Sequence, residues 1–174
     1  MLCYSAGCSI EVKSYGYNTD LLGYIRLNGV AVWQAAQRGT YPNLIGVSIM
    51  TINPLTCSPS QLRIFDTRYP ARAIELSNYL QAVNDGSVIV GVTGYDPRSQ
   101  LANALPMLQL FGIDVADVQT SGSFAFISQK GFPAKTVLHK VLTAADSCTN
   151  PAQFNADIKG IRARQLCTHH RPIA

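Results

Sequence analysis

The side chains that could carry out chemistry are few and scattered along the chain. The three histidines are His139, His169 and His170, and the ten acidic residues are dispersed without an evident pair. The sequence contains no phosphate-binding glycine loop, no G-x-S-x-G turn and no H-E-x-x-H metal motif. His139 falls in an expected strand and the other two in a polar tail, where structural or exposed roles are common. We therefore expect no enzyme, no cofactor and no metal site.

The five cysteines point to disulfide formation instead. They are Cys3, Cys8, Cys57, Cys148 and Cys167, near both ends and in expected loops. None are spaced C-x-x-C, which disfavours a zinc ribbon or a thioredoxin-type motif. Disulfides persist in oxidising compartments, so the pattern favours a secreted protein with one cysteine left over. No signal-peptide pattern follows Met1, so we expect a mature secreted chain, with a cytosolic protein as the alternative.

Composition limits the class of protein further. The chain has 174 residues, of which 47% are hydrophobic and 14% charged, with a net charge of +4. These values predict a single domain over residues 1–174 with a sizeable core. The basic residues form no dense run, which disfavours nucleic-acid binding. No apolar run reaches the ~18 residues of a membrane span.

The N-terminal part has the alternating pattern of β-strands. Ser9–Gly16 alternates apolar and polar residues, and Leu22–Trp33 carries an Asn-Gly pair between two alternating runs, which is typical of a hairpin. Leu44–Ile52 is almost continuously apolar, so we expect a central strand there. Gln61–Thr67 is its expected partner strand.

The period then changes to that of a helix. From Pro70 to the Asp85-Gly86 exit, apolar residues recur every three or four positions. Ser87–Gly94 reads as a buried strand. Asp96 and Pro97 are expected to begin a second helix, which Pro106 should kink or shorten.

The remaining segments complete a mixed pattern. We expect strands at Gly122–Gly131 and Lys135–Ala144, a short helix at Asn150–Ile158 and a closing strand at Ile161–Leu166. Hairpins combined with helices predict an α/β or α+β fold with a mixed sheet.

Two side chains have both a functional and a structural interpretation. Asp96 follows a buried strand, where α/β sheets tend to place ligands, but it also suits a helix N-cap, which we favour from the residues alone. Trp33 precedes an expected loop, Gln34–Asn43, and could stack on a sugar. A partly buried hairpin tryptophan is the commoner case.

Five pieces of the sequence together resemble one family. They are "GVSIM", "FDT", "DGSVIVGV", the "YD" of Tyr95–Asp96, and "FAFISQKG". In this order and spacing they are similar to the interleukin-like EMT inducer domain, also called the GG domain, over residues 10–143. That domain occurs in secreted cytokine-like proteins and in the stem of protein O-mannose N-acetylglucosaminyltransferase. The resemblance implies secretion, no catalytic machinery and a compact sandwich of twisted β-sheets with flanking helices.

The resemblance also implies a disulfide between the N-terminal region and the C-terminus. Cys8 with Cys167 is the pair that carries over, with Cys3 as a competing partner. The family's cysteine before the hairpin falls at Arg26 here, so its usual bridge is missing. Cys57 and Cys148 are additional and are left to pair with each other.

The resemblance further implies where a ligand would bind. The transferase stem domain binds a GlcNAc-type sugar through an acidic loop residue and neighbouring arginines. Here Tyr95 takes the first acidic position, with Asp96 second, while Ser121 and Asn43 replace two arginines, so the individual contacts do not carry over. What carries over is a location, the rim formed by Asn43, Tyr95, Asp96, Arg98 and the segment Gln119–Ser123, including Ser121. Its polar groups and aromatic ring suit a sugar.

We therefore expect a secreted, lectin-like carbohydrate-binding module that is non-enzymatic and metal-independent. Its partners would be extracellular glycans or glycoproteins. Because a single sugar site is usually weak, self-association into a homo-oligomer would strengthen binding. The alternative is a secreted cytokine-like signal that binds a cell-surface receptor.

Overall fold

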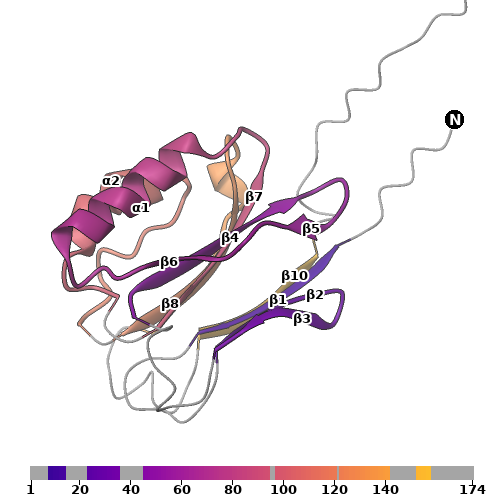
Figure 1. The fold of residues 1–174 in the computed structure, drawn as a ribbon, viewed down its shortest axis with the longest axis horizontal. Coiled ribbons are helices and arrows are strands. Elements are labelled where there is room, and N and C mark those ends of the chain that lie inside the picture. The colour runs from indigo at the N-terminus through magenta and orange to yellow at the C-terminus, as the bar shows by residue number, and fades with distance from the viewer. Residues whose placement is uncertain are drawn as a thin grey trace, which may run out of the picture.

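The computed structural model describes residues 8–14, 23–35, 45–94, 97–120, 122–141 and 152–157. Within these residues two β-sheets pack face to face, and helices cover the outer face of the larger sheet (Figure 1). The smaller sheet has four described strands in the order β10 (Ala152–Asp157), β1 (Ser9–Ser14), β2 (Tyr24–Leu27) and β3 (Val30–Gln34).

The larger sheet has six strands in the described part of the chain. Its order is β5 (Ser58–Pro59), β4 (Val47–Asn53), β7 (Val88–Thr93), β8 (Ser123–Gln129) and β9 (Val137–Val141), and β6 (Arg63–Phe65) also pairs with β4. The helical layer consists of α1 (Pro70–Ala82), the 3₁₀-helix η1 (Leu101–Asn103) and α2 (Leu105–Leu110). A further 3₁₀-helix, η2 (Pro133–Lys135), links β8 to β9.

All strand pairings within the described residues are antiparallel, so the expectation of a mixed sheet is wrong. The strand-helix-strand unit β6–α1–β7 would normally place two parallel strands side by side. Here Val47 of β4 lies opposite both Phe65 of β6 and Thr93 of β7. β4 therefore separates the two, and β6 and β7 run in the same direction without pairing.

The three central strands β4, β7 and β8 are buried on both faces. In β7, Val88, Val90 and Val92 pack towards the smaller sheet, whereas Ile89 packs towards the helices. Because both faces are covered, these strands are almost continuously apolar even though the sheet is antiparallel. The expectation of a central strand near residues 44–52 is confirmed by β4.

Gly91 allows an aromatic ring to lie on the helix-facing side of the sheet. Gly91 is the cross-strand neighbour of Phe126 on β8. A Cβ atom built at Gly91 would lie 2.1 Å from Cζ of the Phe126 ring. The ring therefore occupies the space that any larger side chain at residue 91 would need.

We predict that Gly91→Ala lowers the free energy of unfolding by about 1–3 kcal/mol, because the added methyl group overpacks the core. The control is Gly29→Asn in the β2–β3 turn. There φ is +80°, and a Cβ atom built at Gly29 would have no neighbouring atom within 4 Å. Asparagine tolerates this conformation, so the control should change little. Denaturant unfolding measures both, and equal losses would contradict the packing argument.

The second helix begins later than expected. Residues 98–100 form a bend and turn, η1 follows with Gln100 as its N-cap, and α2 begins only at Leu105 with Ala104 as its N-cap. Asp96 lies outside the described residues, but the expectation that it caps the second helix is wrong, since that position belongs to Ala104. Pro106 lies in the first turn of α2, where its missing N–H is tolerated, so the helix is shortened as predicted.

Residues 152–157 form a strand and not the expected short helix. β10 pairs with β1 over all six residues, from Ser9 opposite Asp157 to Ser14 opposite Ala152. Pairing with an already ordered strand outweighs the weak local preference of so short a segment. The expected closing strand at 161–166 lies outside the described residues.

The disulfide differs from both expected pairs. Cys8 is bonded to Cys57, with Cα atoms 5.6 Å apart, so the pairings Cys8–Cys167 and Cys57–Cys148 are wrong. Cys148 and Cys167 lie outside the described residues. Asn28 shows why Cys8 and Cys57 meet: its Oδ1 accepts a hydrogen bond from the N–H of Ser9, and its Nδ2 lies 3.7 Å from the Cys57 sulfur. The β2–β3 turn thus brings the start of β1 to the β4–β5 hairpin.

We predict that a non-reducing peptide map recovers Cys8 linked to Cys57. Replacing both by alanine should lower the free energy of unfolding by about 2–4 kcal/mol. The two cysteines are 49 positions apart in sequence, so the bond closes a long loop of the chain. Reduction should destabilise the native protein and leave the double variant unchanged. A Cys8–Cys167 peptide would contradict the pairing.

Candidate functional site

The expected rim residues flank three strand ends that meet at one edge of the larger sheet. Val47 at the start of β4 lies opposite Thr93 at the end of β7, and Val92 lies opposite Ala125 near the start of β8. Adjacent antiparallel strands alternate in direction, so these three ends share an edge. The rim candidates Asn43, Tyr95, Asp96 and Ser121 lie outside the described residues, whereas Arg98, Gln119, Thr120, Gly122 and Ser123 lie within them.

The "FDT" motif positions the loop that carries Arg98. Phe65 lies in the core, and the buried Thr67 donates its hydroxyl to the Pro97 carbonyl at 2.8 Å. The Thr67 carbonyl accepts the N–H of Gln100 at 2.9 Å. Thr67 therefore holds both ends of the short segment that contains Arg98.

The acidic residue of the same motif has a local partner. Asp66 accepts hydrogen bonds from Nε and Nη2 of Arg68 at 2.9 and 2.8 Å. These bonds hold the pKa of Asp66 below its ordinary value. Asp66 is thus committed to the turn before α1 and supplies no charge to the rim.

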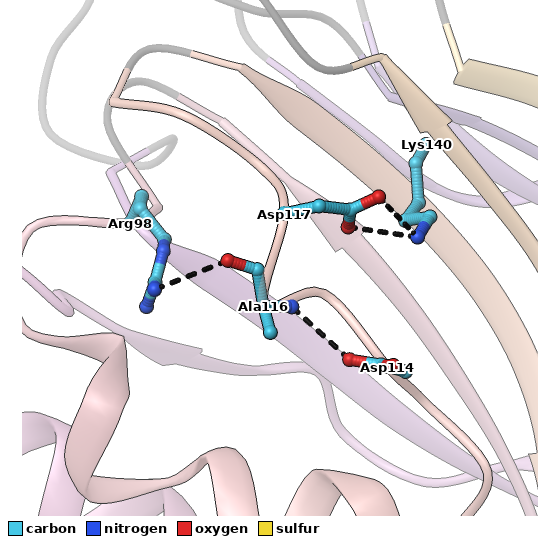
Figure 2. A network of polar contacts seen from close by, with 5 residues as sticks. All are labelled: Arg98, Asp114, Ala116, Asp117 and Lys140. Atoms are coloured by element: carbon cyan, nitrogen blue, oxygen red, sulfur yellow. Dashed lines mark hydrogen bonds and ion pairs between the residues drawn. The ribbon is translucent and has the colours of Figure 1, made fainter.

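Arg98 is half-buried and makes one weak contact in the described part of the chain. Its Nη2 donates to the Ala116 carbonyl at 3.4 Å (Figure 2). A guanidinium group carries five N–H donors, so most of them face no described partner. Within the described residues, most of the hydrogen-bonding capacity of Arg98 is therefore unused.

The loop beside Arg98 is held by its own polar contacts. Asp114 Oδ1 accepts the N–H of Ala116 at 3.2 Å (Figure 2). Val115 and Val118 of the same loop are buried in the core. These anchors fix the direction of the Ala116 carbonyl that meets Arg98.

The same loop carries an ion pair, which Figure 2 also shows. Both carboxylate oxygens of Asp117 accept hydrogen bonds from Nζ of Lys140 on β9, at 2.7 and 2.8 Å. The bond from Lys140 holds the pKa of Asp117 below its ordinary value. Because Asp117 and Lys140 neutralise each other, this pair offers no countercharge to Arg98, for which no ion pair is found within the described residues.

A buried polar network lies beneath this edge. The Ser14 hydroxyl is 2.8 Å from both the carbonyl and the hydroxyl oxygen of Thr93 and accepts the Thr93 N–H at 3.1 Å. The Thr93 hydroxyl in turn accepts the N–H of Phe124 at 2.9 Å and lies 3.1 Å from the Phe124 carbonyl. The Thr93 hydroxyl thus replaces the backbone hydrogen bonds that end where β7 and β8 separate. The Ser14 hydroxyl links β1 of the smaller sheet to β7 of the larger one.

We predict that Thr93→Val lowers the free energy of unfolding by about 1–3 kcal/mol, since it leaves buried backbone groups of Phe124 without a partner. Ser14→Ala should cost a similar amount. The double variant should lose less than the sum of the two, because both hydroxyls belong to one network. The exposed Thr120→Val is the matched control. Strict additivity in denaturant unfolding would contradict a shared network.

The other sequence candidates fall outside the rim or contribute structurally. Trp33 on β3 is partly buried and packs against the core between the sheets, as the commoner interpretation predicted. His139 lies on β9, and His169 and His170 lie outside the described residues. Sequence reasoning missed Asp117, Lys140 and the Ala116 carbonyl. No motif links them, because Asp117 and Lys140 are 23 positions apart and are joined only by the fold.

Residues 45–132 match the protein family described as interleukin-like EMT inducer. The chain belongs to this family. The interleukin-like EMT inducer segment runs from just before β4 to just after β8, so it includes the doubly buried strands, "FDT", Arg98 and the loop around Ala116. The family resemblance inferred from the sequence is thereby confirmed. A search of curated proteins finds no match.

None of the described helices is long and apolar enough to span a membrane. No group of three or more His, Cys, Asp or Glu side chains in the described ranges is placed to hold a metal ion.

Proposed function

We propose that this protein is a secreted, non-enzymatic carbohydrate-binding module that uses the rim to hold a glycan. The observation that carries the proposal is the position of Arg98 at the edge where three loops leave the sheet, with a single hydrogen bond to the described residues. Sugar hydroxyl and ring oxygens accept hydrogen bonds, and a guanidinium offers several donors in one plane. Asn43, Tyr95, Asp96 and Ser121 would supply the remaining polar groups and a stacking ring.

Rigidity of the support favours such a site. Directional hydrogen bonds to a sugar are effective only when the protein groups are held in place before the ligand arrives. Thr67 fixes the backbone around Arg98, and the Ser14–Thr93 network fixes the strand ends below it. Binding through these donors requires no metal, so metal independence is part of the proposal.

Secretion and self-association complete the proposed function. Family membership and the Cys8–Cys57 disulfide support an extracellular location, because structural disulfides persist in oxidising compartments. The partners would then be extracellular glycans or glycoproteins. One exposed sugar site binds weakly, so a homo-oligomer would raise the overall affinity by presenting several sites together.

A glycan array tests the proposal. The native protein should be retained selectively on a subset of glycans, and Arg98→Ala and Asp96→Ala should each abolish retention. The matched control is Arg72→Ala, which removes an exposed arginine of α1 that pairs with Glu75. It should bind like the native protein. Both arginine variants should stay close to the native thermal stability, because Arg72 is exposed and Arg98 makes only one weak hydrogen bond to the described residues.

Silence of the folded native protein across a broad array would overturn carbohydrate binding. That result would favour the alternative, a cytokine-like signal that binds a receptor through its protein surface. Equal binding by the Arg98 and Arg72 variants would place the sugar elsewhere than the rim.

A further inference from the structure

A cleft of about 840 Å³ lies at the edge of the larger sheet opposite the rim. It is formed by three segments, the β4–β5 hairpin, the turn before β7 and the turn after β8. This volume lies within the range of known ligand sites. The cleft is independent of the rim, because it uses the other ends of the same strands.

The floor of the cleft is the helix-facing side of the sheet, beyond the end of α1. Alternate residues of a strand share a face, so Thr51 and Asn53 continue the row that Val47 and Ile49 begin beneath the helices. Ser87 likewise continues the row of Ile89 on β7. The face therefore changes from aliphatic to hydroxyl and amide side chains where the helical cover stops.

Lys130 lies where the helical cover stops, and its side chain is bonded to the end of α1. Its Nζ donates to the carbonyls of Gln81 and Val83 at the end of α1. Asp85 lies 3.9 Å from the same Nζ, and its carboxylate side chain is 88% exposed. The only charge left open to a ligand in the described cleft is therefore acidic, which disfavours phosphate, sulfate and other anions.

The uncommitted groups of the cleft are neutral donors and acceptors. The hydroxyls of Thr51, Ser58 and Ser87 have no side-chain partner within the described residues. Asn53 Oδ1 accepts the N–H of Leu55 at 2.9 Å, which fixes the side chain and leaves its NH₂ group as a donor. Asn53 and Ser58 are paired across β4 and β5, so their side chains lie on one face.

Apolar surface accompanies these groups. Leu55 at the hairpin tip is 56% exposed, and Pro54, Pro59 and Phe132 also line the cleft. Neutral hydrogen-bonding groups next to flat apolar surfaces match the alternating hydroxyl and C–H faces of a sugar ring. The Cys8–Cys57 disulfide restrains the β4–β5 hairpin on one side of the cleft, because Cys57 directly precedes Ser58.

We propose that this cleft is a second binding site for an uncharged saccharide chain, separate from the rim. The ligand class rests on the proposed function, whereas the location rests on the cleft itself. One chain would then contact a glycan, or two glycans, from both edges of the larger sheet.

An NMR titration of the ¹⁵N-labelled full chain tests the proposal. The probes are three neutral tetrasaccharides, cellotetraose, mannotetraose and chitotetraose, with a sulfated tetrasaccharide as the charged comparison. The expected result is saturable shifts of the Asn53, Ser87 and Gly131 amides with a neutral probe and not with the sulfated one. Shifts confined to the residues around Arg98, or stronger cleft shifts with the sulfated probe, would overturn the second site.

Paired variants make the test specific. Ser58→Trp should fill the cleft and abolish its shifts, whereas Thr56→Trp, on the same hairpin but outside the lining, should leave them intact. Ser87→Ala removes one hydroxyl and should weaken binding roughly two- to tenfold. Full binding by both Ser58→Trp and Ser87→Ala would overturn the proposal.

The two proposals can fail separately. Cleft shifts that persist in Arg98→Ala, with glycan-array binding also unchanged, would support the cleft and overturn the rim as the sugar site. Binding that needs Arg98 and ignores Ser58→Trp would do the reverse. No shift with any neutral probe, together with a silent array, would overturn both.

Discussion

β1 is fastened to the larger sheet at both of its ends, and the stacking of the layers depends on these two links. Cys8, just before the strand, is bonded to Cys57 in the β4–β5 hairpin. Ser14, at the end of the strand, shares a buried hydroxyl network with Thr93 on β7. β1 lies between β10 and β2, so these links set the position of the smaller sheet. A slip of one residue would turn the buried Ile10 and Val12 towards solvent.

Burial of the larger sheet on both faces decides where polar chemistry can occur. Strands β4, β7 and β8 are apolar through their middle because one face meets the smaller sheet and the other meets the helices. Some polar side chains of this layer bond to backbone groups that the ladder leaves free, as Thr93 does, and others lie where the cover ends, as at Thr51 and Ser87. Both candidate binding regions therefore lie at strand ends. The rim offers the guanidinium of Arg98, and the cleft offers neutral hydrogen-bonding groups and the carboxylate of Asp85.

Local sequence patterns predicted the elements whose signals are local. The Asn28-Gly29 hairpin is confirmed, because both residues adopt the positive φ values that such a turn needs. The helix from Pro70 is also confirmed, with Leu76 and Leu80 buried as its period predicts, although Ile74 of the expected apolar face is exposed. The patterns failed at residues 152–157, where pairing with β1 overrides a weak helical signal, and at the proposed N-cap, because η1 and α2 begin after Asp96. In each failure a contact or boundary beyond the local window decided the outcome.

The sequence by itself determined the family and the apolar central strands that become β4 and β7, because each depends on residue types in consecutive order. The tertiary structure decided the strand order, the Cys8–Cys57 pairing and the Asp117–Lys140 pair in the loop beside Arg98. The Cys8–Cys57 and Asp117–Lys140 pairs join residues 49 and 23 positions apart, and no period or motif encodes which distant segments meet. The opposite cleft has the same origin, since it exists only where α1 ends above a face shared by β4 and β7.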